Sequence, residues 1–327
     1  MYEQNPHAPN NGANIIITIL IPTRNRVQLL RRTLLSVVKH AVPNMEVCVV
    51  DNNSDAVASN MVQQMVDGFE QLYPSINWQH AHSQKPFAAG ARNDGIKLAR
   101  GQYICLLDDD DELLDNSLSL RLKHMQDDPD IALLYCAAQS KIYPYPIAMY
   151  RYYKYDKTRH RKGLMMMSAS CIIINKKIFA DNNLWFDESL RRMEDYDLCR
   201  QLIRLDLKVK SIPQALVKIN LHPDTRMSSN SLGDNDFKDI LVSKWGHEIK
   251  EYLNCYGEGV FIWRKCFGLQ DISYIQIDKI LTAYMGRKPS ASFKVKYRLI
   301  AVSPICFVAM YHISVMISQF YKNRILN

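Results

Sequence analysis

The sequence predicts an α/β protein with a mixed, mostly parallel sheet flanked by helices and a C-terminal α-helical extension. Three observations indicate this class. Short β-branched runs alternate with amphipathic stretches, polar or acidic turns follow several of the runs, and only helical patterns remain beyond residue 233. With 327 residues, 47% hydrophobic and 23% charged, the composition excludes collagen, coiled coil and general disorder.

The first half of the chain alternates strands with helices. In chain order we expect a strand at 15–21, a helix at 26–38, a strand at 46–50, a helix around 61–69, a strand at 76–79, a helix through 91–98 and a strand at 103–107. A sheet built from such units binds ligands at the carboxyl ends of its strands.

The pattern is less regular in the second half. We expect a helix near 118–125, strands at 131–136 and 170–174, a helix at 196–205, two short strands within 208–220 broken at Pro213, and a helix at 240–253. These elements predict a mixed sheet in this half.

An acidic turn follows the strand predicted at 103–107. It holds four consecutive aspartates and a glutamate, residues 108–112. Adjacent anions repel one another, so they are tolerated when they are exposed or when a hard cation such as Mg²⁺, Mn²⁺ or Ca²⁺ neutralises them. A solvated helix N-terminus is the alternative. The position at a strand end favours a ligand site, and Asp51 ends another strand in the same way.

Five segments of the chain resemble, in the expected order, the motifs of the family 2 inverting glycosyltransferases. The similarity covers about residues 15–230, and the segments are 21–26 (IPTRNR), 49–55 (VVDNNSD), 90–104 (GARNDG to ARGQYI), 108–110 (DDD, at the D-x-D element) and 192–198 (RMEDYDL, at the E-D motif). The resemblance implies the GT-A (Rossmann-like) fold. It also implies metal-assisted, inverting transfer of a sugar from a nucleoside-diphosphate sugar to a saccharide or lipid-linked saccharide, in surface polysaccharide biosynthesis.

The resemblance also assigns the metal site. A carboxylate-held Mg²⁺ or Mn²⁺ stabilises the departing diphosphate as a Lewis acid. Asp110 matches the metal ligand and Asp108 the ribose contact, but four consecutive aspartates leave the register open by one position, so Asp109 or Asp111 can take either role. His222 stands where many members carry a metal-binding histidine; a histidine in an ordinary loop or core position is the alternative.

Asp195 matches the general base that takes the proton of the acceptor hydroxyl. The alternative is that Glu194 and Asp195 only favour a helix N-terminus. Thr23, Asp51 and Arg92 are the other candidate nucleotide contacts, together with Asp108 and Asp109. A surface ion pair explains Arg92 equally well.

Two segments outside the motifs bear on partners. Residues 143–155 contain six of the 18 tyrosines, and 151–162 is basic, which suits a phosphate-linked glycan, single-stranded nucleic acid or a plain solvated insertion. We do not expect a nucleic-acid partner. Residues 299–321 carry no formal charge and have basic flanks, which favours association with an anionic membrane surface over packing as a buried helix.

These predictions divide the chain into a flexible N-terminus at 1–14, a catalytic nucleotide-sugar-binding domain at 15–233, a helical region at 234–298 and a membrane-associating helix at 299–327. The N-terminus lacks the order of a signal peptide, so we expect a cytoplasmic protein, peripheral to or anchored at the membrane's cytoplasmic face. Two rival functions are a sugar-nucleotide-binding protein without turnover and a sugar-nucleotide pyrophosphorylase. The glycine-rich loop of the latter is not found after the first strand.

Overall fold

The computed structural model describes residues 14–85, 87–142, 147–151, 168–221 and 236–246. The chain divides into two compact units, Met1–His222 and Pro223–Asn327. Helix α8 (Asp236–Trp245) is the described helix of the second unit. The boundary predicted near residue 233 falls in the segment 222–235, outside the described residues.

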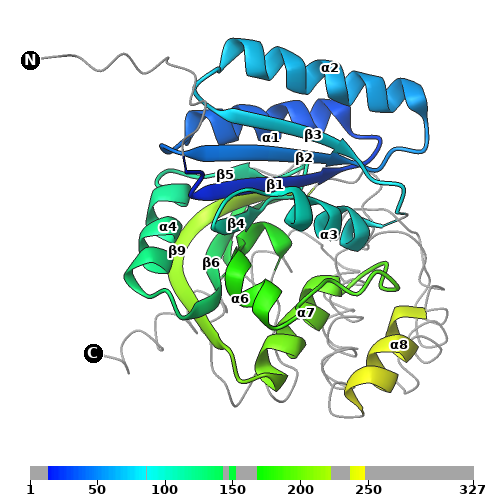
Figure 1. Cartoon of the computed structure of the whole chain (residues 1–327), viewed down its shortest axis with the longest axis vertical. Coiled ribbons are helices and arrows are strands. Elements are labelled where there is room, and N and C mark those ends of the chain that lie inside the picture. The colour runs from blue at the N-terminus through cyan, green and yellow to red at the C-terminus, as the bar shows by residue number, and fades with distance from the viewer. Residues whose placement is uncertain (1–13, 86, 143–146, 152–167, 222–235, 247–327) are drawn as a thin grey trace, which may run out of the picture. The chain divides into compact units, whose positions relative to one another are not determined.

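The first half of the larger unit is a parallel α/β arrangement (Figure 1). Strand β1 pairs in parallel with β2 and β4, and β2 pairs in parallel with β3. The elements are β1 (Ile17–Thr23), α1 (Val27–Lys39), β2 (Met45–Asp51), α2 (Ala56–Leu72), β3 (Asn77–His82), α3 (Ala88–Leu98) and β4 (Tyr103–Leu106). The predicted alternation is confirmed here, with boundaries moved by a few residues.

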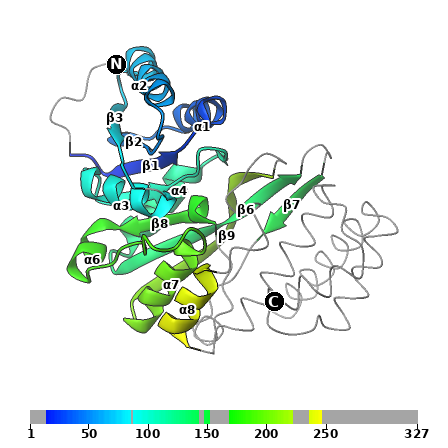
Figure 2. The ribbon, with the colours of Figure 1, turned by 90° about the vertical axis from the view of Figure 1, so that its right-hand side faces the viewer.

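The helices cover both faces of this half-sheet. Figure 2 shows α1 and α2 together on one side of β1, β2 and β3, with α3 on the other side. Right-handed crossovers require this, because the chain moves from β1 outward to β3 and then returns past β1 to β4. The strand order therefore reverses between β1 and β4, and such a switch point is where open α/β sheets bind ligands.

Buried β-branched and aliphatic side chains explain why these segments form strands. Every residue of β1 and β2 is buried, which is typical of strands covered on both faces. Helix α3 packs closely on β1 because Gly95 has no side chain: a Cβ there would lie 2.1 Å from Leu20 Cδ1. Gly95 of the 90–104 motif is thus required for the packing of α3 on the sheet.

The second half continues the same sheet with mixed pairing. In the described part, nine strands form one sheet in the order β3-β2-β1-β4-β8-β6-β9-β5, with β7 paired to β6. Strand β8 is antiparallel to β4 and β6, whereas β6 and β9 are parallel. The elements are β5 (Glu112–Leu113), α4 (Ser117–Asp127), β6 (Ile131–Ile142), β7 (Ile147–Arg151), the 3₁₀ turn η1 (Ala169–Cys171), β8 (Ile172–Asn175), α6 (Lys176–Asp181), α7 (Glu194–Arg204) and β9 (Lys208–Leu221).

Two prolines behave differently from the prediction. The segment predicted as two strands broken at Pro213 is one strand, β9, because Pro213 falls in a bulge between the pairs Cys136–Ile212 and Ala137–Ala215. A bulge accommodates proline since no ladder hydrogen bond is needed there. Pro22 lies inside β1 and not at its end. At Pro22, β1 still pairs with β2 but no longer pairs with β4.

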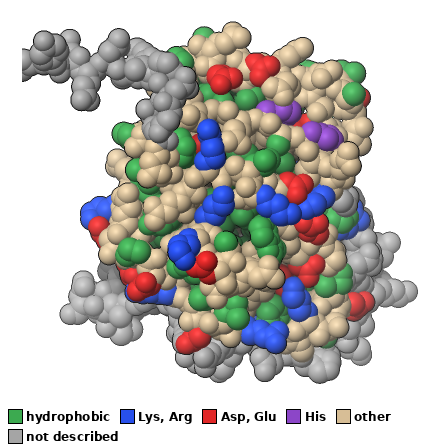
Figure 3. Space-filling view, viewed as in Figure 1, with side chains coloured by type: hydrophobic (Ala, Val, Ile, Leu, Met, Phe, Trp, Pro, Cys, Tyr) green, Lys and Arg blue, Asp and Glu red, His purple; other side chains and the backbone are tan. Residues whose placement is uncertain are grey.

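On the face seen in Figure 3, Lys, Arg, Asp and Glu side chains are interspersed and hydrophobic side chains appear as scattered patches. Such a mixture is ordinary for a water-facing domain. The face seen in Figure 3 therefore does not by itself mark a functional site.

Candidate active site

The acidic turn directly follows β4 at the switch point. Its first and last aspartates are joined by a 3.1 Å hydrogen bond from the Asp111 amide to the Asp108 carbonyl. Among the described residues, Asp108, Asp110 and Asp111 form a group whose ligand oxygens all lie within 4.8 Å of one another. Three of the four aspartates therefore converge, and Asp109 points elsewhere.

Helix α1 and strand β9 hold the backbone of the acidic turn in this shape. From α1, Thr33 Oγ1 donates to the carbonyls of Asp109 and Asp111 at 2.9 and 2.8 Å, and Arg32 donates to the Asp110 carbonyl at 2.8 Å. From β9, the Asn220 amide side chain donates to the same Asp110 carbonyl at 2.9 Å. These contacts fix the turn through its backbone carbonyls.

Ser170 in η1 ties the two ends of the turn together. Its buried hydroxyl accepts from the Asp108 amide at 3.0 Å and donates to Asp111 Oδ2 at 2.6 Å. The backbone amide of Asn220 donates to the other oxygen of Asp111 at 3.1 Å. Both carboxylate oxygens of Asp111 therefore accept hydrogen bonds from the protein.

We expect Ser170→Ala to lower the free energy of unfolding by about 1–3 kcal/mol, because it leaves a buried amide and a buried carboxylate oxygen without this partner. Urea denaturation of the full chain measures the change. Ser119→Ala is the matched control, since its hydroxyl is exposed on α4 and its loss is expected to cost less than about 0.5 kcal/mol. Equal unfolding free energies for the two variants would contradict the anchoring role.

Asp109 is directed toward the β1 turn. Its carboxylate accepts from Thr23 Oγ1 at 2.8 Å and pairs with Arg26 Nη1 at 3.1 Å. Burial raises the pKa of Asp109 to about 7, and Arg26 opposes that shift. These contacts join the ends of β1 and β4. The nucleotide contacts predicted for Thr23 and Asp109 stay predictions.

Arg92 connects the acidic turn to the E-D motif. From α3, its guanidinium donates to Asp108 Oδ1 and to Glu194 Oε1, both at 2.6 Å, and lies 5.5 Å from the centre of the Phe186 ring. The side chain is only 4% exposed, so the ion pair is buried and is not the surface pair considered from the sequence. Burial opposes the charged form of Arg92, but the two carboxylates outweigh it and raise the pKa of Arg92.

Asp195 lies in the first turn of α7. The residue before Glu194, Met193, has a φ of 64°, a left-handed conformation that is strained for such a side chain and that starts the helix abruptly. Burial raises the pKa of Asp195 to about 7, with Glu194 and Asp108 adding to the shift and Arg92 opposing it. A carboxylate with a pKa near neutral is suited to general base catalysis.

Asn93, next to Arg92 on α3, holds the segment that leads into α7. Its side-chain amide accepts from the Phe186 amide at 3.0 Å and donates to the Phe186 carbonyl at 2.9 Å. It also donates to Glu188 at 2.9 Å. Asn93 stands inside the 90–104 motif, but no local signal marks it as a site residue, because its role depends on a contact 93 positions away in the chain.

Asp51 organises the turn after β2 beside the acidic site. It is fully buried, accepts from the Asn53 amide at 2.8 Å and from the Ser59 hydroxyl, and lies 3.4 Å from His82 Nδ1. Asp51 is also the register partner of Thr23. The two predicted nucleotide contacts are thus neighbours across β1 and β2, and binding by Asp51 stays a prediction.

The chemistry of the acidic turn fits a divalent cation. The converging ligands are all carboxylate oxygens, which Mg²⁺ and Mn²⁺ prefer. The carboxylates of Asp108 and Asp110 are only 31% and 6% exposed, so an ion held there would be partly withdrawn from water. Asp110, whose carbonyl anchors the turn, remains the candidate direct ligand. The predicted ligand His222 lies outside the described residues.

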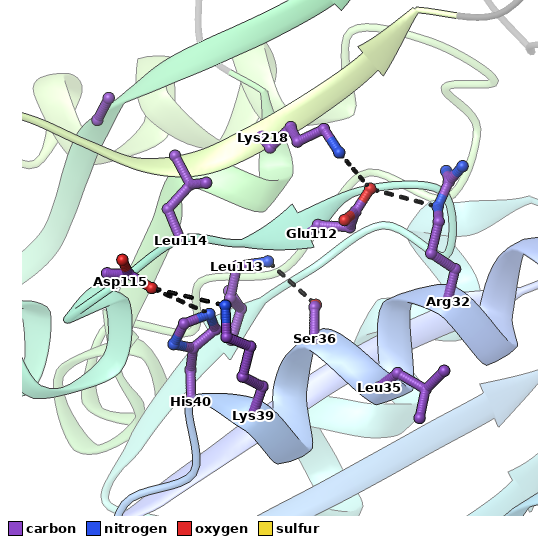
Figure 4. Close-up of a pocket in the computed structure, with 11 residues that line it drawn as sticks. Arg32, Leu35, Ser36, Lys39, His40, Glu112, Leu113, Leu114, Asp115 and Lys218 are labelled. Atoms are coloured by element: carbon purple, nitrogen blue, oxygen red, sulfur yellow. Dashed lines mark hydrogen bonds and ion pairs between the residues drawn. The ribbon is translucent and has the colours of Figure 1, made fainter.

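A pocket of about 660 Å³ lies behind the acidic turn, between α1 and the strands β5 and β9 (Figure 4). Lys218 and Arg32 pair with Glu112 at 2.9 and 3.4 Å, and Lys39 lies 3.8 Å from Asp115. Arg32 also donates to the Asp110 carbonyl, and Glu112 accepts from the Asn220 side chain, so these two lining residues connect the pocket wall to the acidic turn.

The segments predicted to bind the acceptor and the membrane remain predictions. Much of the tyrosine-rich, basic stretch at 143–162 and all of 299–327 lie outside the described residues. Among the helices that the structure describes, none has the length and apolar character needed to cross a bilayer.

Sequence and structure comparisons identify the family. The family model described as glycosyl transferase family 2 matches residues 18–182, half of the chain. The putative colanic acid biosynthesis glycosyl transferase WcaA of Escherichia coli K12 is 31% identical over 197 residues, which cover 58% of this chain and 67% of WcaA. The amylovoran biosynthesis glycosyltransferase AmsB of Erwinia amylovora is 28% identical over 240 residues, which cover 68% and 74% of the two chains.

The fold is shared with solved structures. The crystal structure of S. aureus TarS 1–349 in complex with UDP-GlcNAc superimposes with a TM-score of 0.57 at 17% identity, covering 83% of this chain and 71% of that one. The family match and this shared fold together show a glycosyltransferase of the GT-A fold. The chain belongs to glycosyl transferase family 2.

Proposed function

We propose that this glycosyltransferase moves a sugar from a nucleoside-diphosphate sugar to a saccharide or lipid-linked saccharide, with divalent-metal assistance and inversion at the anomeric carbon. The observation that carries the proposal is the Arg92 bridge, which brings Asp108 of the acidic turn and Glu194 of the E-D motif to 2.6 Å from one guanidinium. A candidate donor site and a candidate base thereby share one buried network.

The donor side uses the strand ends at the switch point. Asp110, with Asp108 and Asp111, would hold Mg²⁺ or Mn²⁺, which when bound supplies Lewis-acid stabilisation of the departing diphosphate. Thr23, Asp51 and Arg92 surround the position where we place the nucleotide, with Asp108 facing its ribose. We keep His222 as a candidate further ligand from the resemblance alone.

The acceptor side uses Asp195. The acceptor oxygen forms a bond to the anomeric carbon while the bond from that carbon to the diphosphate oxygen breaks, and Asp195 takes the hydroxyl proton. Arg92 holds Glu194 and thus the first turn of α7 against the donor side. Holding both substrates in line on opposite faces of the sugar ring supplies part of the rate and gives inversion.

The relatives' names support a polysaccharide setting, since WcaA is named for colanic acid biosynthesis and AmsB for amylovoran biosynthesis. We infer a surface-polysaccharide pathway and a place at the cytoplasmic face of the membrane. The last 49 residues, which hold eight basic and no acidic residues, suit peripheral contact with anionic lipid.

A donor screen tests the function. We expect one class among UDP-, GDP- and dTDP-sugars to raise the unfolding temperature in the presence of Mn²⁺, because a ligand at 100 times its Kd stabilises the folded state by about 2.7 kcal/mol. EDTA is expected to abolish this shift. With that donor and an acceptor, NMR of the product is expected to show an inverted anomeric configuration. Retention of configuration, or stabilisation that EDTA leaves unchanged, would contradict the proposal.

A further inference from the structure

Arg26 places a positive charge against the candidate metal ligands. It lies at the N-terminal cap of α1, and its Nη1 is 3.1 Å from Asp109 Oδ1 and 3.3 Å from Asp110 Oδ2. Its side chain is 23% exposed, whereas both carboxylates are 6% exposed. One guanidinium therefore bridges two buried anions of the acidic turn.

Asp110 consequently has two competing roles. It is one of the three carboxylates whose ligand oxygens lie within 4.8 Å of one another, and it is also a partner of Arg26. A divalent ion that binds Asp110 approaches the guanidinium, and like charges at such a distance repel each other in a partly buried site. The ion must therefore either displace Arg26 from Asp110 or bind despite the electrostatic repulsion from the guanidinium.

A diphosphate changes this balance. Its oxygens offer a guanidinium a bidentate anionic partner and offer the metal additional oxygen ligands. Arg26 is exposed enough to move toward such a ligand, and it sits at the end of β1, where we place the nucleotide. Arg92 contrasts with it, since that side chain is 4% exposed and locked between Asp108 and Glu194.

We propose that Arg26 is a built-in counter-cation, which keeps the affinity of the acidic turn for a divalent metal low until a nucleoside diphosphate is present. The inference rests on the proposed donor site. Metal and diphosphate then bind cooperatively, and by thermodynamic linkage each raises the affinity for the other by the same factor. The device prevents the site from holding a metal ion tightly when no donor is bound.

The test measures Mn²⁺ binding to the full-length protein by electron paramagnetic resonance, with Mn²⁺ alone and then with UDP, GDP or dTDP. In the wild type, we expect weak binding of Mn²⁺ alone and about five- to 150-fold tighter binding with the nucleotide that the site accepts. In Arg26→Gln, we expect Mn²⁺ alone to bind about tenfold more tightly and the nucleotide effect to shrink. Titrations of nucleotide without protein correct for Mn²⁺ held by the nucleotide.

Two further variants separate charge from other effects. Arg26→Lys keeps the positive charge and is expected to retain weak binding of Mn²⁺ alone. Arg31→Gln removes an exposed charge from α1 and is expected to bind Mn²⁺ as the wild type does. If the wild type binds Mn²⁺ and Arg26→Gln binds it no more tightly, the counter-cation role is wrong and the proposed function stands. If no variant binds Mn²⁺ with or without nucleotide, the proposed metal site itself is wrong.

Discussion

Asp195→Asn is expected to lower kcat for sugar transfer by about 10²–10⁴-fold while leaving the Kd of the donor unchanged, because an amide cannot take the proton of the acceptor hydroxyl. Transfer assays combined with calorimetric donor titrations measure the two quantities. Measuring kcat and Kd separately distinguishes the base from two alternatives. A binding protein without turnover would show no transfer in the wild type, and a residue that contacts the donor would change the Kd of the donor when it is replaced.

The pH profile provides an independent readout of the same residue. Burial raises the pKa of Asp195 to about 7, and a general base acts only when it is deprotonated. The wild-type rate is therefore expected to rise with pH through about 7, and the residual rate of Asp195→Asn is expected to lack that rise. Asp181→Asn, an exposed carboxylate on α6, is the matched control and is expected to keep the wild-type rate and profile. A wild-type kcat in Asp195→Asn would show that Asp195 is not the general base.

Asp110→Asn is expected to weaken metal-dependent donor binding by at least about 100-fold, since changes in groups that merely support metal ligands already cost 10–100-fold in affinity. Titration of the donor in Mn²⁺ and in EDTA measures the metal-dependent part. Asp115→Asn changes a carboxylate that is 84% exposed and only five positions away, and it is expected to leave both affinities unchanged. Equal metal dependence in Asp110→Asn and wild type would exclude Asp110 as a ligand.

The parallel half of the fold could be predicted because its signals are local. The run 47–50 in β2 is wholly apolar, and the acidic turn after β4 is visible as four consecutive aspartates. Short or weakly patterned elements carry no such signal, which is why β5 (Glu112–Leu113) and β7 (Ile147–Arg151) were not predicted. Tyr150 of β7 belongs to the tyrosine-rich stretch 143–155, whose composition fits a binding segment or a solvated insertion and gives no strand pattern.

The internal geometry of the site depends on tertiary contacts. From the sequence, any of the four aspartates could face the ligand; in the structure, the oxygens of Asp108, Asp110 and Asp111 form the close group, while Asp109 accepts a hydrogen bond from Thr23. The left-handed conformation of Met193 has no local cause, because neither glycine nor asparagine occupies that position. The sequence alone is compatible with a surface ion pair at Arg92, and only the fold shows that its two partners come from the turn after β4 and from α7.

The most direct test of the central claim is an anomalous difference map from crystals grown with Mn²⁺ and the nucleoside diphosphate that the donor screen selects. The account predicts one strong manganese peak in contact with a carboxylate oxygen of Asp110, with the diphosphate bound to the same ion and Asp195 across the site. A nucleotide bound at the switch point without manganese at the acidic turn, or manganese bound away from Asp110, would contradict it.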